Sequence, residues 1–80
     1  MSDAPDQTIA VVQKNGRDAY HVMIRHFKGS TFVDLRIFTE NGERERIATK
    51  TGITIRPELL GQVIAALQQA EKAARTEGLL

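Results

Sequence analysis

Helical periodicity occurs in only one segment of this chain, the stretch of residues after Pro57. Proline suits the first position of a helix, and Glu58 follows where its charge favours the helix dipole. Gly78 then ends the pattern. Between these limits, apolar residues recur at the three- and four-residue spacing of one helical face, at Leu60, Val63, Ile64, Leu67, Ala70 and Ala74. The segment therefore predicts one helix of about five turns.

Four shorter segments before this helix are typical of β-strands, and they cover residues 8–14, 20–27, 31–38 and 43–49. Turn-forming residues separate them, at Asn15-Gly16, Lys28-Gly29-Ser30 and Glu40-Asn41-Gly42. The pattern predicts an α+β fold, a four-stranded antiparallel sheet followed by one C-terminal helix. Because one helix covers only one face of a sheet, the other face must meet water, a partner or a ligand. We expect the function on that face.

The chain is short for a stable fold. A domain of its 80 residues buries only about 60% of the surface that its unfolded chain exposes. It has no cysteine, so neither a disulfide nor a zinc ribbon can reinforce it. We therefore expect a homodimer, with Leu60, Gly61, Ile64 and Leu67 of the helix as the candidate dimer contacts. Residues 1–7 are predicted to be a disordered tail, and residues 8–80 a single domain.

Strand alternation predicts which side chains share the uncovered face. In the second strand, Tyr20, Val22, Ile24 and His26 point one way, and His21, Met23, Arg25 and Phe27 point the other. In the third strand, Phe32, Asp34, Arg36 and Phe38 lie opposite an apolar set. In the fourth, Arg44, Arg46, Ala48 and Lys50 share one side. Three strands thus supply cations and aromatic rings to one surface.

Rings interleaved with cations suit unpaired nucleic acid, since bases stack on rings and on guanidinium planes while cations contact phosphates. Residues 14–56 support this interpretation because they carry nine basic and five acidic residues. The alternative is an ordinary surface, in which Phe32 and Phe38 pack at the sheet edge and the arginines have cross-strand partners such as Asp34. The residues alone leave both interpretations open.

Catalytic and metal-binding arrangements are not evident. His21 and His26 are predicted to point to opposite faces of one strand, which excludes a shared metal site. Neither Ser2 nor Ser30 has a histidine or acid that would activate it. We predict no enzyme activity, no metal and no cofactor. No leader or membrane-spanning segment is present in the sequence, so we expect a cytoplasmic protein, associated with the nucleoid if it is bacterial.

Several motifs occur in a familiar order along the chain. Arg25-His26-Phe27-Lys28-Gly29 precedes Asp34-Leu35-Arg36, and Gly52-Ile53-Thr54-Ile55-Arg56-Pro57-Glu58 follows. Their order and spacing resemble the C-terminal domain of the transcriptional positive cofactor four family, over most of the chain. No Ser-rich and Lys-rich arm like that of the eukaryotic protein precedes Thr8. The compact form therefore resembles bacterial and phage members of the family.

The resemblance implies a curved four-stranded sheet that dimerises through its helices, so that two sheets form opposed channels for single strands. By this resemblance, Arg25, Phe27 and Arg36 are expected to contact nucleic acid, and Lys28 and Lys50 are expected to contact phosphates. Strand alternation adds Arg44 and Arg46 to these candidates. Thr39 stands where the eukaryotic domain has a stacking tryptophan, and Thr51 replaces a basic residue. Phe38 is the candidate that takes over some of the stacking.

We therefore expect non-enzymatic binding of single-stranded DNA by a homodimer, with RNA as a second candidate ligand. The implied role is in transcription regulation, replication or repair, together with the machinery of those processes. A protein-interaction adaptor for a polymerase or repair factor is the alternative, with nucleic-acid binding incidental. A binder of duplex or structured RNA is a third hypothesis.

Overall fold

The computed structural model describes residues 6–80, which fold into four strands and one helix. In chain order these are β1 (Gln7–Gln13), β2 (Asp18–Phe27), β3 (Ser30–Glu40), β4 (Arg46–Ile55) and α1 (Pro57–Thr76). The α+β fold predicted from the sequence is confirmed. Of the predicted tail, residues 1–5 lie outside the described residues, whereas Gln7 already belongs to β1 and Asp6 bonds to β2.

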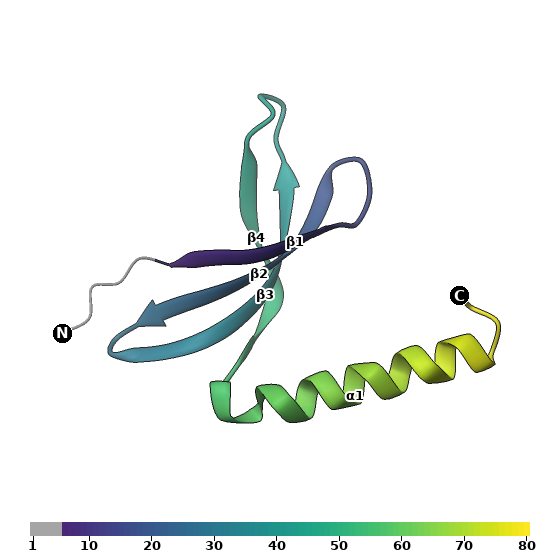
Figure 1. Ribbon diagram of the computed structural model, residues 1–80. Coiled ribbons are helices and arrows are strands. Elements are labelled where there is room, and N and C mark those ends of the chain that lie inside the picture. Colours follow the sequence, from purple (N-terminus) through teal and green to yellow (C-terminus); the bar gives the residue numbers. More distant parts are fainter. Residues whose placement is uncertain (1–5) are drawn as a thin grey trace.

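The four strands form one antiparallel sheet in the order β1-β2-β3-β4, so each strand pairs with its neighbour in sequence (Figure 1). Tight turns explain this meander. The Asn15 side chain accepts hydrogen bonds from the backbone N–H groups of Arg17 and Asp18, at 2.9 and 2.8 Å. Lys28 and Gly29 both have positive φ, as a two-residue type I′ turn between β2 and β3 requires.

Two irregularities in the strand register accompany the curvature of the sheet. One lies in β1, between Thr8 and Ala10. The other lies where β3 pairs with β4, between Arg36 and Phe38. Extra residues in one strand of a pair bend it and increase its twist. Between these irregularities, β2 and β3 pair without interruption from Asp18 and Thr39 to Phe27 and Ser30.

The helix α1 begins and ends where the sequence predicts. Pro57 opens its first turn with Glu58 next to it, although Arg56 at the N-cap makes no capping hydrogen bond through its side chain. At the other end, Gly78 takes a φ of 77°. Its N–H donates to the carbonyl of Arg75 at 3.1 Å, which satisfies one of the last carbonyls of the helix.

α1 runs along one face of the sheet and extends beyond it (Figure 1). A cavity of about 310 Å³ lies between the two, lined entirely by apolar surface. Its walls include Val22, Ile24, Val33 and Leu35 of the sheet and Leu60, Val63, Ile64 and Leu67 of the helix. Among the hydrophobic residues from 6 to 80, only Ala19 and Val33 are buried, and no residue of α1 is. The single chain therefore leaves much of its apolar surface uncovered.

Candidate nucleic-acid interface

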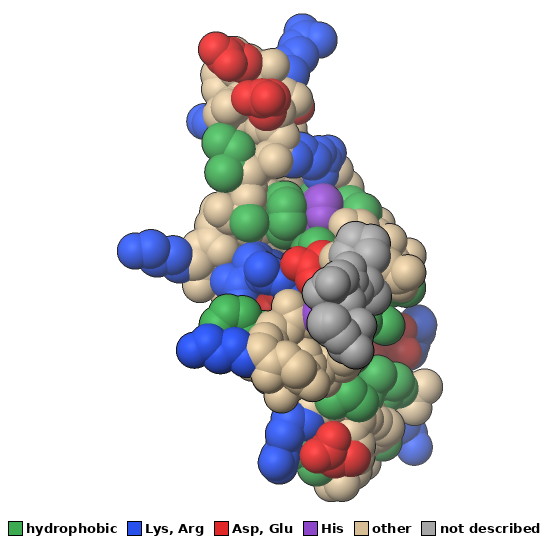
Figure 2. All heavy atoms as spheres, turned by 90° about the vertical axis from the view of Figure 1, so that its left-hand side faces the viewer, with side chains coloured by type: hydrophobic (Ala, Val, Ile, Leu, Met, Phe, Trp, Pro, Cys, Tyr) green, Lys and Arg blue, Asp and Glu red, His purple; other side chains and the backbone are tan. Residues whose placement is uncertain are grey.

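The open face is the face of the sheet turned away from α1. Val22, Ile24 and Val33 line the cavity beneath the helix, so alternation places His21, Arg25 and Asp34 on the opposite side of the sheet. Met23 also borders this cavity. The register sets His21 opposite Arg36, Met23 opposite Asp34, Arg25 opposite Phe32 and Ala19 opposite Phe38. Figure 2 shows this side of the molecule, with Lys and Arg side chains spread along it and hydrophobic and histidine side chains between them.

Phe27 and Lys28 lie together at the turn between β2 and β3. The Phe27 side chain ends its strand and is 63% exposed, the highest fraction among the phenylalanines and other large hydrophobic residues of β2 and β3. The Lys28 Nζ lies 5.3 Å from the centroid of its ring, within the range of a cation–π contact. The pair presents an aromatic surface and a cation side by side.

Arg36 is held within the open face rather than free on its surface. Its Nε donates to Asp34 Oδ2 at 2.8 Å and its Nη2 to Asp34 Oδ1 at 2.9 Å, in a bidentate pair. Nη1 donates to the carbonyl of Thr49 in β4 at 3.1 Å. Asp34 is fully buried, and the side chain of Arg36 is only 17% exposed. Its hydrogen bonds to Asp34 raise the pKa of the Arg36 guanidinium.

Gly52 makes room for this ion pair. It lies directly across from Arg36 in the pairing of β3 with β4. A Cβ at this position would lie 2.7 Å from the carbonyl oxygen of Leu35 and 3.0 Å from Cζ of Arg36. Such contacts are shorter than van der Waals distances, so only glycine allows the guanidinium to lie across this strand. The glycine of the third sequence motif thus has a structural explanation.

Arg25 lies between two carboxylates. Its Nε is 3.3 Å from Asp6 Oδ2, and its Nη1 is 3.7 Å from Asp34 Oδ2. The other Asp6 oxygen accepts a hydrogen bond from the His26 backbone N–H at 3.0 Å. This backbone bond is the largest cause of the lowered pKa of Asp6; desolvation opposes it, and the contact with Arg25 lowers the pKa further. The Arg25 side chain remains 39% exposed.

Phe38 stacks on His21, with ring centroids 3.9 Å apart and ring planes 10° apart. His21 is buried, and its two ring nitrogens have no hydrogen-bond partner among residues 6–80. Burial lowers the pKa of His21, and the charge of Arg46 lowers it further. Because one face of its ring is already covered, Phe38 has less free surface for a base than Phe27 has.

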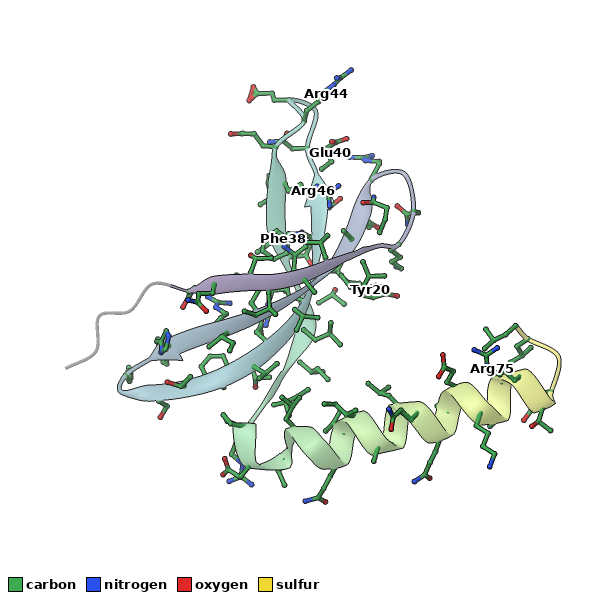
Figure 3. All side chains as sticks on the ribbon, in the orientation of Figure 1. Tyr20, Phe38, Glu40, Arg44, Arg46 and Arg75 are labelled. Atoms are coloured by element: carbon green, nitrogen blue, oxygen red, sulfur yellow. The ribbon has the colours of Figure 1, made fainter. Side chains whose placement is uncertain are left out.

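The cations predicted on the fourth strand differ in their positions. Arg46 lies in β4 and its Nη2 donates to Gln13 Oε1 of β1 at 3.0 Å. Arg44 is not in the strand, so the prediction that alternation places it on this face is wrong. It has a φ of 66° in the turn between β3 and β4, at the tip of that hairpin (Figure 3). Lys50 is exposed within the irregular stretch between Ala48 and Gly52, where alternation is interrupted.

Sequence reasoning missed the part played by Asp6, which it assigned to the tail. It also assigned no role to His21. For Asp34 a signal existed, because an acid two residues before Arg36 in a strand shares its face. The structure thus brings Arg25, Arg36 and Asp34 together, places Phe27 and Lys28 at one end of the open face, and sets Arg44 apart at a hairpin tip.

Residues 6–80 show neither a metal-binding cluster nor a membrane-spanning helix. No group of three or more His, Asp or Glu side chains in this part of the chain is placed to hold a metal ion. No helix in the same range has both the length and the apolar character needed to cross a membrane.

The fold defines a class of small α+β domain, in which one helix covers one face of a four-stranded meander and the other face is open. Residues 14–66 match the family described as Transcriptional Coactivator p15 (PC4). Since the match spans more than half of the 80 residues, the chain belongs to the PC4 family, a transcriptional-coactivator and DNA-binding family. The resemblance predicted from the sequence motifs is confirmed.

Solved structures of bacterial and phage homologues are similar to this chain. The orthorhombic crystal form of a PC4 homolog from Burkholderia pseudomallei K96243 has 35% sequence identity and a TM-score of 0.79, covering 89% of this chain and 96% of that one. Its tetragonal form has 38% identity and a TM-score of 0.78, covering 82% of this chain and 97% of that one.

A homolog from bacteriophage T5 shares the fold, with 20% identity and a TM-score of 0.68, over 95% of this chain and 90% of that one. That phage protein is described as implicated in recombination-dependent DNA replication. No curated protein sequence matches the chain.

Proposed function

We propose that this protein binds single-stranded DNA on the open face, as a homodimer and without catalysing a reaction. The observation that carries the proposal is the exposed ring of Phe27 beside Lys28 and two positions from Arg25 on the same face. Bases of an unpaired strand stack on such a ring, and neighbouring cations neutralise the phosphates. Stacking on aromatic side chains contributes about 1–3 kcal/mol per base and tolerates any sequence.

The cations of the face contribute unequally in this proposal. Lys28, Lys50 and Arg46 are exposed and are the candidate phosphate contacts, together with the partly exposed Arg25. Arg36 is held by Asp34 and Thr49, so it orders the face and presents only a minor part of its guanidinium to a ligand. Arg44 at the hairpin tip contacts a strand only if the strand runs past the end of the sheet.

Dimerisation is supported by the apolar surface that one chain leaves uncovered. Ile64 and Leu67 are 47% and 60% exposed, although they border the apolar cavity with Leu60. A Cβ at Gly61 would meet no atom within 4 Å in this chain, so packing within it does not require glycine there. A second copy that packs on α1 would cover these residues and account for a glycine that lets another backbone approach.

The family supports a cellular role in transcription or replication, and the phage homolog favours replication, with repair as a further expected role. We expect the protein in the cytoplasm, at the nucleoid if the cell is bacterial. A protein-interaction adaptor is the second candidate. The hydrophobic residues Ile9, Val11 and Val12 of the edge strand β1, each about half exposed, favour it because an uncovered apolar strand is a common docking surface.

The test is fluorescence anisotropy of a labelled oligo-dT of about 20 nucleotides, titrated with protein at several salt concentrations. We expect tight binding that weakens steeply with salt and that unlabelled duplex does not displace. Displacement by duplex or structured RNA would favour the third hypothesis. Absence of binding at low salt would refute the proposed function and make a protein partner the next target.

A further inference from the structure

Two hydrogen-bond donors of β2 converge on Asp6, the residue just before β1. The register of β1 with β2 ends at the pairing of Gln7 with Ile24, so His26 lies beyond the last paired position. Its backbone N–H donates to Asp6 Oδ1 at 3.0 Å, and Arg25 Nε donates to Asp6 Oδ2 at 3.3 Å. One carboxylate thus bridges a backbone donor and a guanidinium.

The charge of Arg25 is available to the anion at the position of Asp6, because the Asp34 carboxylate already has Arg36 as its partner. Both Asp34 oxygens accept short hydrogen bonds from Arg36, at 2.8 and 2.9 Å, whereas Arg25 Nη1 is 3.7 Å away. The contact of Arg25 with Asp34 is therefore the weaker one. Asp6 is the other anion that meets Arg25, and it does so at a partly exposed position.

The same donors fit a phosphodiester. A phosphate, like a carboxylate, offers two acceptor oxygens on one central atom, and guanidinium and backbone N–H groups are its usual partners on proteins. Arg25 lies on the open face, two positions from the exposed Phe27 ring. A strand whose base stacks on Phe27 brings a phosphate within reach of Arg25, where it meets the like charge of Asp6.

We propose that Arg25 Nε and the His26 backbone N–H form a phosphate site, which Asp6 occupies in the free protein and a backbone phosphate takes over when single-stranded nucleic acid binds. This inference rests on the proposed function and adds that Asp6 competes with the bound strand. Asp6 imitates the ligand, keeps the site ordered without it, and lowers the affinity. The acid must move away for the phosphate to enter, since both cannot share the two donors.

The first test compares Asp6→Asn with the parent in the anisotropy titration. The substituted amide oxygen still accepts from the His26 N–H, while the charge is lost. We expect binding tighter by about two- to fivefold at low salt, and a smaller gain at high salt. Glu77→Gln is the matched control, because it removes the same charge at the exposed end of α1. Equal affinities of the two variants would overturn the inference.

A second test does not depend on oligonucleotide binding. Inorganic phosphate is titrated into isotope-labelled Asp6→Asn protein, and the NMR signals of the His26 amide and the Arg25 Nε–H are followed. We expect both signals to shift in a saturable way, because phosphate displaces a neutral amide, and much less so in the parent, where the charged carboxylate of Asp6 holds the donors. No shift at either group would overturn the phosphate site. If the parent fails to bind oligo-dT but these signals shift, the proposed function fails and the site stands.

Discussion

Replacing Arg36 by alanine tests whether this arginine supports the fold more than it contacts a ligand. The substitution removes all hydrogen bonds from Arg36 to Asp34, a carboxylate that is fully buried in the parent. Removing one partner of a buried ion pair costs about 3–5 kcal/mol. Arg25, 3.7 Å from Asp34, compensates in part, so we expect a loss of about 3 kcal/mol in the free energy of unfolding. Domains of this size have a stability of only about 4–12 kcal/mol, so the effect is large.

The assay is urea denaturation followed by circular dichroism, with all variants at one protein concentration because a dimer's stability depends on it. The double variant Asp34→Ala with Arg36→Ala removes both charges, and we expect it to be more stable than Arg36→Ala alone by about 1 kcal/mol or more. Arg36→Lys keeps the charge but cannot form the bidentate pair, so it should fall between the parent and Arg36→Ala. If the free energy of unfolding of Arg36→Ala is within about 0.5 kcal/mol of the parent's value, the structural role of Arg36 is refuted.

Four further outcomes are expected. Phe27→Ala should weaken oligo-dT binding by about 1–3 kcal/mol in the anisotropy titration while its thermal unfolding stays close to the parent's, because the ring is exposed. Gly52→Ala should lower the urea midpoint, because its Cβ would collide with the carbonyl oxygen of Leu35. Leu67→Asp should shift the protein towards monomer in size-exclusion chromatography with light scattering. The parent should lose stability as the pH falls below about 6.5, the ordinary pKa of histidine. The reason is that the pKa of His21 is lowered in the folded protein, so the unfolded chain takes up the proton first. His21→Phe should reduce that loss.

Matched variants distinguish these explanations from general damage. Phe27→Tyr keeps the ring and should bind about as well as the parent, so a similar loss in both variants would contradict base stacking. Gln69→Asp adds the same charge to an exposed part of α1, and an equal shift to monomer would contradict a specific role for Leu67. An unchanged pH dependence in His21→Phe would show that another group controls acid stability.

Alternation predicted the open face correctly where the strands pair without interruption. β2 and β3 keep one register throughout, so the period of two set Arg25, Phe27 and Arg36 on one face in the sequence and in the structure. The prediction was wrong for Arg44, because the strand begins only at Arg46 and the turn before it has its own geometry. The first residue of β4 depends on where this strand pairs with β3, and the alternation of side chains in the sequence does not indicate that pairing.

The partner of Arg25 also had no signal in the sequence. Asp6 is 19 residues away along the chain, and the two meet only because β1 folds back along β2. By contrast, the pair of Asp34 with Arg36 is local, two residues apart in one strand, whereas the sequence interpretation named Asp34 as a partner across strands. A charge pair within one strand can be predicted from alternation. A pair between two strands can be predicted only when the register of those strands is known.

The two arginines that approach Asp34 show why residue type alone does not define the binding surface. Arg36 makes two hydrogen bonds to that buried carboxylate and a third to Thr49, so its charge is compensated inside the protein. Arg25 lies farther from Asp34 and meets the partly exposed Asp6 instead. An external phosphate can replace Asp6 at little cost, since both anions are solvated, but replacing Asp34 would strand a buried charge. On the open face, Arg25 is therefore the arginine whose anionic partner can be exchanged. Its partner in the free protein, Asp6, competes with the phosphate of a bound strand.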